Sequence, residues 1–280
     1  DRESNARTCK GEEMDSVGKF TATPIVYHGP GSMEKLREEV KNLGARRAAI
    51  ITDPGLVASG IAERVTEATG VETFCFGDVQ PEPPLELVDR GAAFLKENRA
   101  EVVIGLGGGS SIDTAKMAAA MTANQGKVSD YFGVNVLPKP GLPVIAIPTT
   151  AGTGSEVSPA SVFVDSGSRS KKGVRSDFLL PRAAILDATL TISLPAHLTA
   201  STGIDALTHA IEGYTSTQGT FISDLMAEQA VSLIGENLRR AFARGSDLAA
   251  RHGMLMGSYL AGITLAIANV GVVHALAQTI

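Results

Sequence analysis

Two glycine-rich segments carry the residues best suited to hold a phosphate group. The first follows the apolar run 102–104 and reads Gly105-Leu106-Gly107-Gly108-Gly109-Ser110-Ser111-Ile112-Asp113, ahead of a helix-forming stretch. Glycines let backbone N–H groups approach a phosphate, and a helix N-terminus adds partial positive charge. We expect Ser110 and Ser111 to cap this helix and to donate hydroxyls to phosphate oxygens. A strand-to-helix turn without a ligand is the alternative, but such a turn does not require so many glycines.

The second segment follows the apolar run 144–148, which reads as a buried strand. Its sequence is Thr149-Thr150-Ala151-Gly152-Thr153-Gly154-Ser155-Glu156, so hydroxyl groups alternate with glycines. Neither segment ends in the Gly-Lys-Ser/Thr of a Walker loop. Two polar glycine loops after two strands therefore favour a dinucleotide over a nucleoside triphosphate.

A carboxylate and an imidazole four residues apart point to a metal ion. Asp205 and His209 would share one face of a helix and converge on one cation. An isolated pair of this kind is more often a surface ion pair. Here the flanking residues are apolar, so we expect a largely buried helix in which the carboxylate needs a partner. His274, also in apolar company, is a candidate third ligand.

These segments, with Ile185-Leu186-Asp187 and 253–277, resemble the iron-containing (group III) alcohol dehydrogenase family from about residue 23 to the last residue. The resemblance implies that Asp205, His209 and His274 bind a divalent metal and serve catalysis. It implies NAD(P) on the glycine loops, with Gly107, Gly108, Gly109, Ser110, Ser111, Asp113, Thr149, Thr150 and Thr153 as the candidate contacts. Lys171 matches a lysine that contacts the cofactor in relatives; a solvated residue of the basic run 169–175 is the alternative.

Two departures from the family pattern concern the end of the chain. The family's fourth metal ligand would fall beyond Ile280, and Gln278 stands where many members carry a histidine near the substrate. We therefore expect the chain to be a C-terminally incomplete part of a longer protein. We also expect no histidine-based proton relay at position 278.

Asp53 bears on the choice of cofactor. It follows the apolar strand expected over 48–52, where a carboxylate can accept hydrogen bonds from an adenosine ribose and repel a 2′-phosphate. The resemblance gives it the same role, although an Asp before Pro54-Gly55 is also a common turn residue. We predict that NAD is preferred over NADP.

Composition excludes several classes of function. The 280 residues carry a net charge of −5 and no long basic run, so nothing indicates nucleic-acid binding. The N-terminal residues lack the apolar core of a signal peptide. Cys9 and Cys75 form no disulfide framework, and Cys75, in the apolar strand-like run 71–76, is expected to be a buried thiol. We read the apolar stretch 259–277 as a buried helix pair instead of a membrane span, because polar residues interrupt it. A cytoplasmic homo-oligomer without membrane or nucleic-acid partners is expected.

The order of elements predicts two domains. Residues 1–194 alternate strands (20–27, 48–52, 72–76, 102–105, 144–147) with helices (31–43, 60–69, 85–98), which indicates an α/β domain with a parallel sheet covered by helices on both faces. Residues 195–280 read as an all-helical domain (199–214, 221–243, 248–267, 270–280). The resemblance implies a dehydroquinate synthase-like architecture. We expect the ligand cleft between the two domains.

Together these features predict an NAD-dependent and metal-dependent alcohol dehydrogenase acting on a small primary alcohol or diol and its aldehyde. The metal would act as a Lewis acid on the substrate oxygen, and the cofactor would exchange the hydride. Mixed carboxylate and imidazole ligands suit Fe(2+) or Zn(2+), and the resemblance favours iron. The alternatives are a lyase or isomerase of the dehydroquinate synthase type and an inactive truncated binding protein.

Overall fold

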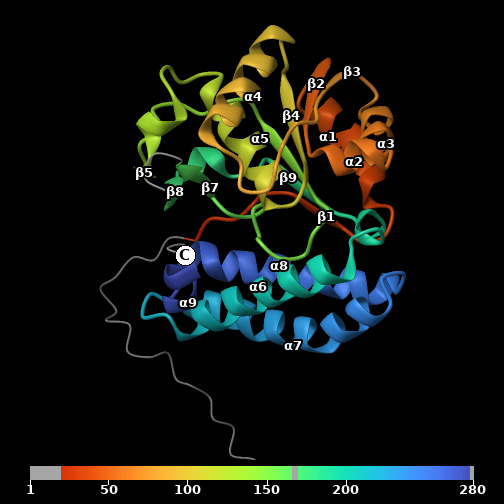
Figure 1. Ribbon diagram of the computed structural model, residues 1–280, viewed down its shortest axis with the longest axis vertical. Coiled ribbons are helices and arrows are strands. Elements are labelled where there is room, and N and C mark those ends of the chain that lie inside the picture. Colours follow the sequence, from red (N-terminus) through yellow and green to blue (C-terminus); the bar gives the residue numbers. More distant parts are fainter. Residues whose placement is uncertain (1–19, 166–169, 278–280) are drawn as a thin grey trace, which may run out of the picture.

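The computed structural model describes residues 20–165 and 170–277 and contains a parallel sheet flanked by helices, above a separate layer of helices (Figure 1). Cys9 and Gln278 lie outside the described residues. The predicted fold class is confirmed: an α/β part is followed by a helical part. The predicted boundary at 194/195 falls between a short 3₁₀ helix (Ala188–Thr191) and α6 (Ala196–Thr215).

The central sheet has six parallel strands in the order β1 (Val26–His28), β9 (Ala183–Leu186), β6 (Val144–Pro148), β4 (Val102–Gly107), β2 (Arg47–Ile51) and β3 (Glu72–Phe76). The chain moves outward from β2 to β3 and then returns to the other side of β2 with β4. A parallel sheet of this kind has a crevice at the carboxyl ends of the two strands where the order reverses.

Helices cover both faces of the sheet, because alternate side chains of each buried strand point to opposite faces. In β2, Ala48 and Ile50 pack with α1 (Leu36–Asn42) and α3 (Ile61–Thr69), whereas Ala49 and Ile51 pack with α4 (Leu85–Glu97) and α5 (Gly109–Met121). The short α2 (Pro54–Ala58) follows β2 directly.

Several local expectations were wrong. The first strand covers only 26–28, and β5 (Gly133–Val134), β8 (Ser170–Arg175) and β7 (Ala160–Asp165) form a small sheet that the sequence analysis did not predict. Cys75 is exposed because β3 is an edge strand of the central sheet.

The helical part consists of α6, α7 (Phe221–Ala243), α8 (Leu248–Ala268) and α9 (Val272–Ala277). Residues 259–277 do form parts of two helices, but no residue of α9 is buried in the described structure. No helix in the described ranges has the length and apolar character that a membrane span requires. Large apolar side chains are exposed on three of these helices: Leu198, Ile204 and Ile211 on α6, Phe221, Ile222, Leu225, Val231 and Phe242 on α7, and Val272, Val273 and Leu276 on α9.

The loop after β6 joins the two parts through a backbone contact. A Cβ atom built on Gly154, whose φ is +62°, would lie 2.5 Å from the Cα of Gly262 in α8, and one built on Gly262 would lie 2.8 Å from the Cα of Gly154. Glycine is therefore needed on both sides of the contact. The same loop buries Glu156, whose main-chain oxygen accepts a 2.8 Å hydrogen bond from the Thr23 hydroxyl.

Burial governs the ionisation of Glu156. Its side chain is 2% exposed, and desolvation raises its pKa to about 7 despite its own backbone N–H and the charge of Lys116. The Glu156 carboxyl group therefore stays protonated in the folded protein at pH values at which it is already ionised in the unfolded chain.

The first prediction concerns the contact between the two glycines. Gly262→Ala should lower the free energy of unfolding by about 1–3 kcal/mol, because backbone atoms leave no room for the methyl group. Gly235→Ala in α7 is the matched control, since its Cβ meets nothing within 4 Å. That control should be stabilising by about 0.5–1 kcal/mol. Urea denaturation of both variants measures the difference, and equal effects would contradict the contact.

The second prediction concerns pH. A raised carboxyl pKa means that wild-type stability falls as pH rises from the unfolded value of Glu towards about 7. Glu156→Gln cannot ionise, so its stability relative to wild type should increase over the same range, by up to roughly 3 kcal/mol. Urea denaturation across this range tests the idea, and parallel pH profiles for the two proteins would refute it.

Candidate active site

The crevice at the carboxyl edge of the sheet brings together the loops that follow β2, β4 and β6. Asp53 follows β2, and its Oδ2 lies 3.3 Å from the position that a Cβ on Gly107 would take. Gly107 ends β4 with a φ of +137°, a conformation that favours glycine. The two loops therefore meet at the point where the strand order reverses.

The first glycine loop leaves the N-terminus of α5 open. Gly108 is the N-cap residue and has no side-chain cap, so Ser110 and Ser111 lie inside the first turn, and the expectation that they cap the helix was wrong. A Cβ on Gly109 would lie 2.7 Å from Cγ2 of Thr153, so the absence of a side chain lets the two glycine loops touch. Unpaired N–H groups at such a helix start are suited to bind an anion.

Two adjoining cavities contain nearly all predicted site residues. They share Gly109, Ser110 and Thr153, and the cavity on the α2 side is lined by Asp53, Gly108, Ser111, Thr149 and Thr150. The other cavity is lined by Asp113, Lys171, Asp205, His209 and His274. Gly107 lines neither cavity and shapes the turn beneath them. The cavities form one cleft from the end of β2 to the histidines.

Sequence reasoning missed a buried lysine that fixes the second glycine loop. The Lys116 side chain is fully buried, and its Nζ donates to the main-chain oxygens of Ser155 (3.0 Å), Ser158 (3.2 Å) and Ala160. It also pairs with Asp113 Oδ1 at 3.0 Å. The sequence places Lys116 three residues after Asp113 on a predicted helix, but it does not indicate that the lysine is buried.

Asp113 therefore has a structural role beside its predicted one. Its carboxylate accepts hydrogen bonds from the Ser155 hydroxyl and, at 2.9 Å, from the Val162 N–H, in addition to its pair with Lys116. These bonds fasten α5 to the loop after β6 and to β7. Direct contact of Asp113 with a cofactor stays a prediction.

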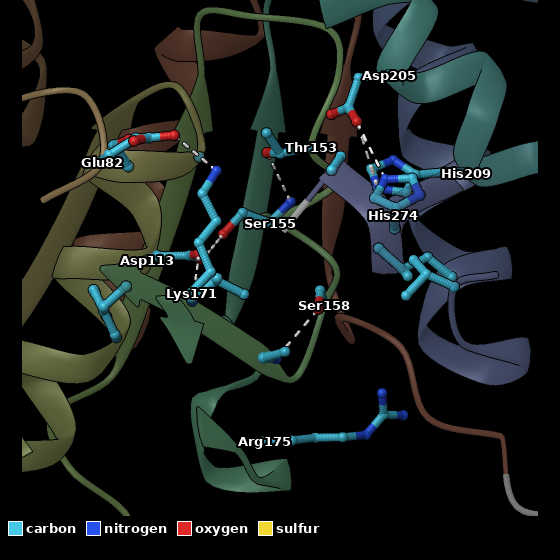
Figure 2. A pocket seen from close by; sticks show the side chains of 18 of the residues that line it. Glu82, Asp113, Thr153, Ser155, Ser158, Lys171, Arg175, Asp205, His209 and His274 are labelled. Atoms are coloured by element: carbon cyan, nitrogen blue, oxygen red, sulfur yellow. Dashed lines mark hydrogen bonds and ion pairs between the residues drawn. The ribbon is translucent and has the colours of Figure 1, made fainter. Parts of the chain in front are cut away.

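Two cationic side chains line the same cavity as the histidines: in Figure 2 Lys171 lies across the cavity from them and Arg175 lies at the bottom of the view. Lys171 forms a 2.8 Å ion pair with Glu82. Arg175 donates to the Ala266 oxygen at 2.5 Å and to Asn269 Oδ1 at 3.2 Å, at the end of α8. Arg175 thus ties the small sheet to the turn that precedes α9.

Asp205, His209 and His274 converge at one end of the cleft, and one ligand atom from each lies within 4.8 Å of the others. Asp205 Oδ1 is 3.3 Å from His274 Nε2 and 3.9 Å from His209 Nε2. The imidazole rings stack with centroids 4.4 Å apart (Figure 2). α6 supplies the first two residues one turn apart, and α9 supplies the third.

The helix that carries the pair is less buried than expected. Ala206 and Ala210 are fully buried, whereas Ile204 and Ile211 are about half exposed. The apolar residues next to the pair therefore face two environments: the two alanines are buried, and the two isoleucines are partly exposed to solvent. His209 is buried, at 6% exposure, whereas the Asp205 side chain is in contact with solvent.

The electrostatics of the three residues are coupled. Burial lowers the pKa of His209, although the negative charge of Asp205 acts in the opposite direction and raises it. The hydrogen bond with Asp205 raises the pKa of His274, with further support from Glu212. For Asp205, burial opposes ionisation, but His274 and the charge of His209 hold its pKa below the usual value.

The donor set fits a divalent metal ion. Two imidazole nitrogens and a carboxylate oxygen are the ligands that Fe(2+) and Zn(2+) accept, and separations of 3.3 and 3.9 Å suit atoms that share one ion at about 2.0–2.2 Å. Nδ1 of His209 is buried and makes no regular hydrogen bond, although the Gly152 backbone is close enough to raise the pKa of the ring. His209 Nε2 lies 3.9 Å from Asp205 Oδ1, too far for a hydrogen bond, so this nitrogen is available to an ion.

Both parts of the chain match models of one known family. The family model for iron-containing alcohol dehydrogenase matches residues 23–188, and that for the family's C-terminal part matches 199–280. The chain is 46% identical to long-chain-alcohol dehydrogenase 1 of Geobacillus thermodenitrificans over 94% of this chain and 67% of that protein.

Two solved structures extend the comparison. A 1,3-propanediol oxidoreductase superposes with a TM-score of 0.91 at 35% identity, over 94% of this chain and 69% of that one. Sulfoacetaldehyde reductase from Bifidobacterium kashiwanohense, solved with NAD+, gives 0.87 at 33% identity, over 93% and 70%. Both the family models and the relatives identify an oxidoreductase of alcohols and aldehydes. The chain belongs to the iron-containing alcohol dehydrogenase family.

Proposed function

We propose that this protein is an NAD-dependent and metal-dependent dehydrogenase that interconverts a small primary alcohol or diol and its aldehyde. The observation that carries the proposal is the Asp205, His209 and His274 cluster at the end of a cleft that is continuous with both glycine loops. In the 1,3-propanediol and sulfoacetaldehyde enzymes a related fold acts on small oxygenated substrates.

The glycine-loop side of the cleft would hold NAD. The open N-terminus of α5 and the hydroxyls of Ser110, Thr150 and Thr153 suit the pyrophosphate. Asp53 suits the adenosine ribose, and Lys171 would meet the cofactor in the other cavity, the one that the histidines also line. When bound, NAD supplies the hydride acceptor.

The histidine side would hold the metal and the substrate. Asp205, His209 and His274 would bind Fe(2+), with Zn(2+) as the second candidate, and the ion would supply Lewis-acid chemistry at the substrate oxygen. Phe163, Val164 and Leu265 line the same cavity and suit the alkyl part of an alcohol.

The dehydrogenase and its two alternatives, a binding protein and a lyase or isomerase, predict different results in one assay. The purified protein is mixed with NAD, Fe(2+) and a panel of primary alcohols and diols, and NADH is followed by absorbance. Turnover supports the dehydrogenase. Cofactor binding without turnover supports a binding protein, and conversion without net NADH supports the lyase or isomerase. A cytoplasmic location and a homo-oligomeric state stay predictions.

The metal assignment predicts the effect of removing one ligand. His209→Ala should abolish alcohol oxidation and retention of the metal through dialysis, because only two of the three donors remain. NAD binding should persist, since its proposed contacts lie on other loops. His197→Ala, an exposed histidine on the same helix, is the control and should match wild type. A His209→Ala protein that keeps its metal and its turnover would show the assignment to be wrong.

The proposed role of Asp53 predicts a change in cofactor preference. Wild type should favour NAD in kcat/KM. Asp53 Oδ1 accepts a 3.0 Å hydrogen bond from the Leu56 N–H at the start of α2, so Asp53→Asn keeps an N-cap residue and removes the charge. The NAD preference should fall by about tenfold, or ~1.4 kcal/mol. Equal or better wild-type kcat/KM with NADP would overturn the role.

A further inference from the structure

Glu212 lies on the same face of α6 as the two ligands of that helix, seven residues after Asp205. Its side chain is 8% exposed. The carboxylate accepts hydrogen bonds from the N–H groups of Gly271 at 2.9 Å and Val273 at 2.6 Å, and its Oε2 lies 2.5 Å from His274 Nδ1. Gly271 immediately precedes α9, and Val273 and His274 lie in its first turn.

This carboxylate compensates for the weak intrinsic stability of α9. The helix has six residues, none of them buried, and isolated helices of that length do not persist in water. A carboxylate that binds N–H groups of the first turn satisfies donors that the helix cannot satisfy itself. A Cβ on Gly271 would lie 3.0 Å from Glu212 Oε1, so a glycine there gives the carboxylate room.

The same contact decides which nitrogen of His274 faces the ligand cluster. Nδ1 lies 2.5 Å from Glu212, whereas Nε2 lies 3.3 Å from Asp205. The shorter contact holds one imidazole proton on Nδ1, so Nε2, the nitrogen that faces Asp205, is the one that would give up its proton and bind the metal. A carboxylate behind a histidine ligand in this way fixes its tautomer and orientation.

We propose that Glu212 is a positioning residue for His274: it docks α9 on α6 and fixes the imidazole with Nε2 towards the metal. The inference rests on the proposed metal site. Glu212 also accepts both backbone N–H bonds, so it would hold the third ligand in place in the metal-free protein.

A double-mutant cycle on metal affinity tests the proposal. Zn(2+) is titrated calorimetrically into metal-free wild type, Glu212→Gln, His274→Ala and the double variant. Glu212→Gln should bind about 10- to 100-fold more weakly than wild type. In the His274→Ala background the same change should have no further effect, because no imidazole is left to orient. Glu228→Gln, which changes an exposed carboxylate that accepts a 3.1 Å bond from Tyr214 on the neighbouring helix, should match wild type.

Hydrogen exchange of the metal-free proteins provides a second readout. Glu212→Gln should speed amide exchange in peptides covering 271–277 and leave those covering 205–209 unchanged. Unchanged affinity together with unchanged exchange would overturn the proposal, as would an equal loss of affinity with and without His274. If wild type binds no Zn(2+), the proposed metal site is wrong, and so is the proposal that Glu212 orients His274 towards a metal. The hydrogen-exchange result then still decides whether Glu212 docks α9 on α6.

Discussion

The contact between Gly154 and Gly262 determines how the two parts of this protein share one cleft. The loop after β6 lies against α8 with two backbones in contact, a distance that no side chain permits. That approach places Thr153 where it lines both cavities, between the glycine turn of β4 and the histidines. Cofactor loops on a sheet and ligands on separate helices thus become neighbours.

The loop needs a second constraint, because glycines and hydroxyls alone do not hold one conformation. Lys116 provides this second constraint, because its side chain donates hydrogen bonds to three carbonyl groups of residues 155–160. Asp113 compensates the buried positive charge of Lys116. In the helical part a rigid element also holds the site residues, because one face of α6 carries Asp205, His209 and Glu212. Rigid elements therefore orient the groups that a metal and a substrate would meet.

Much of this arrangement could be predicted from the sequence. Short apolar strands followed by glycines indicate a parallel sheet with its loops at one edge, and the spacing of Asp205 and His209 places both on one helical face. The small β5-β8-β7 sheet was missed because its strands are partly exposed and rich in polar residues, as in Ser170–Arg175.

Contacts between distant residues could not be predicted in the same way. The burial of Lys116 depends on carbonyls some forty residues away, and Glu212 meets α9 about sixty residues later. The same limit explains the errors about Cys75, whose exposure follows from an edge position, and about Ile204 and Ile211, whose side chains are about half exposed. Residue type indicated the chemistry, whereas tertiary structure decided which residues support it.

Anomalous X-ray diffraction from crystals loaded with Fe(2+) would locate the metal ion in this protein. We expect one strong peak at the iron edge, within coordination distance of Asp205, His209 and His274, at the histidine end of the cleft. A peak elsewhere, or none in crystals that contain iron in stoichiometric amount, would contradict it.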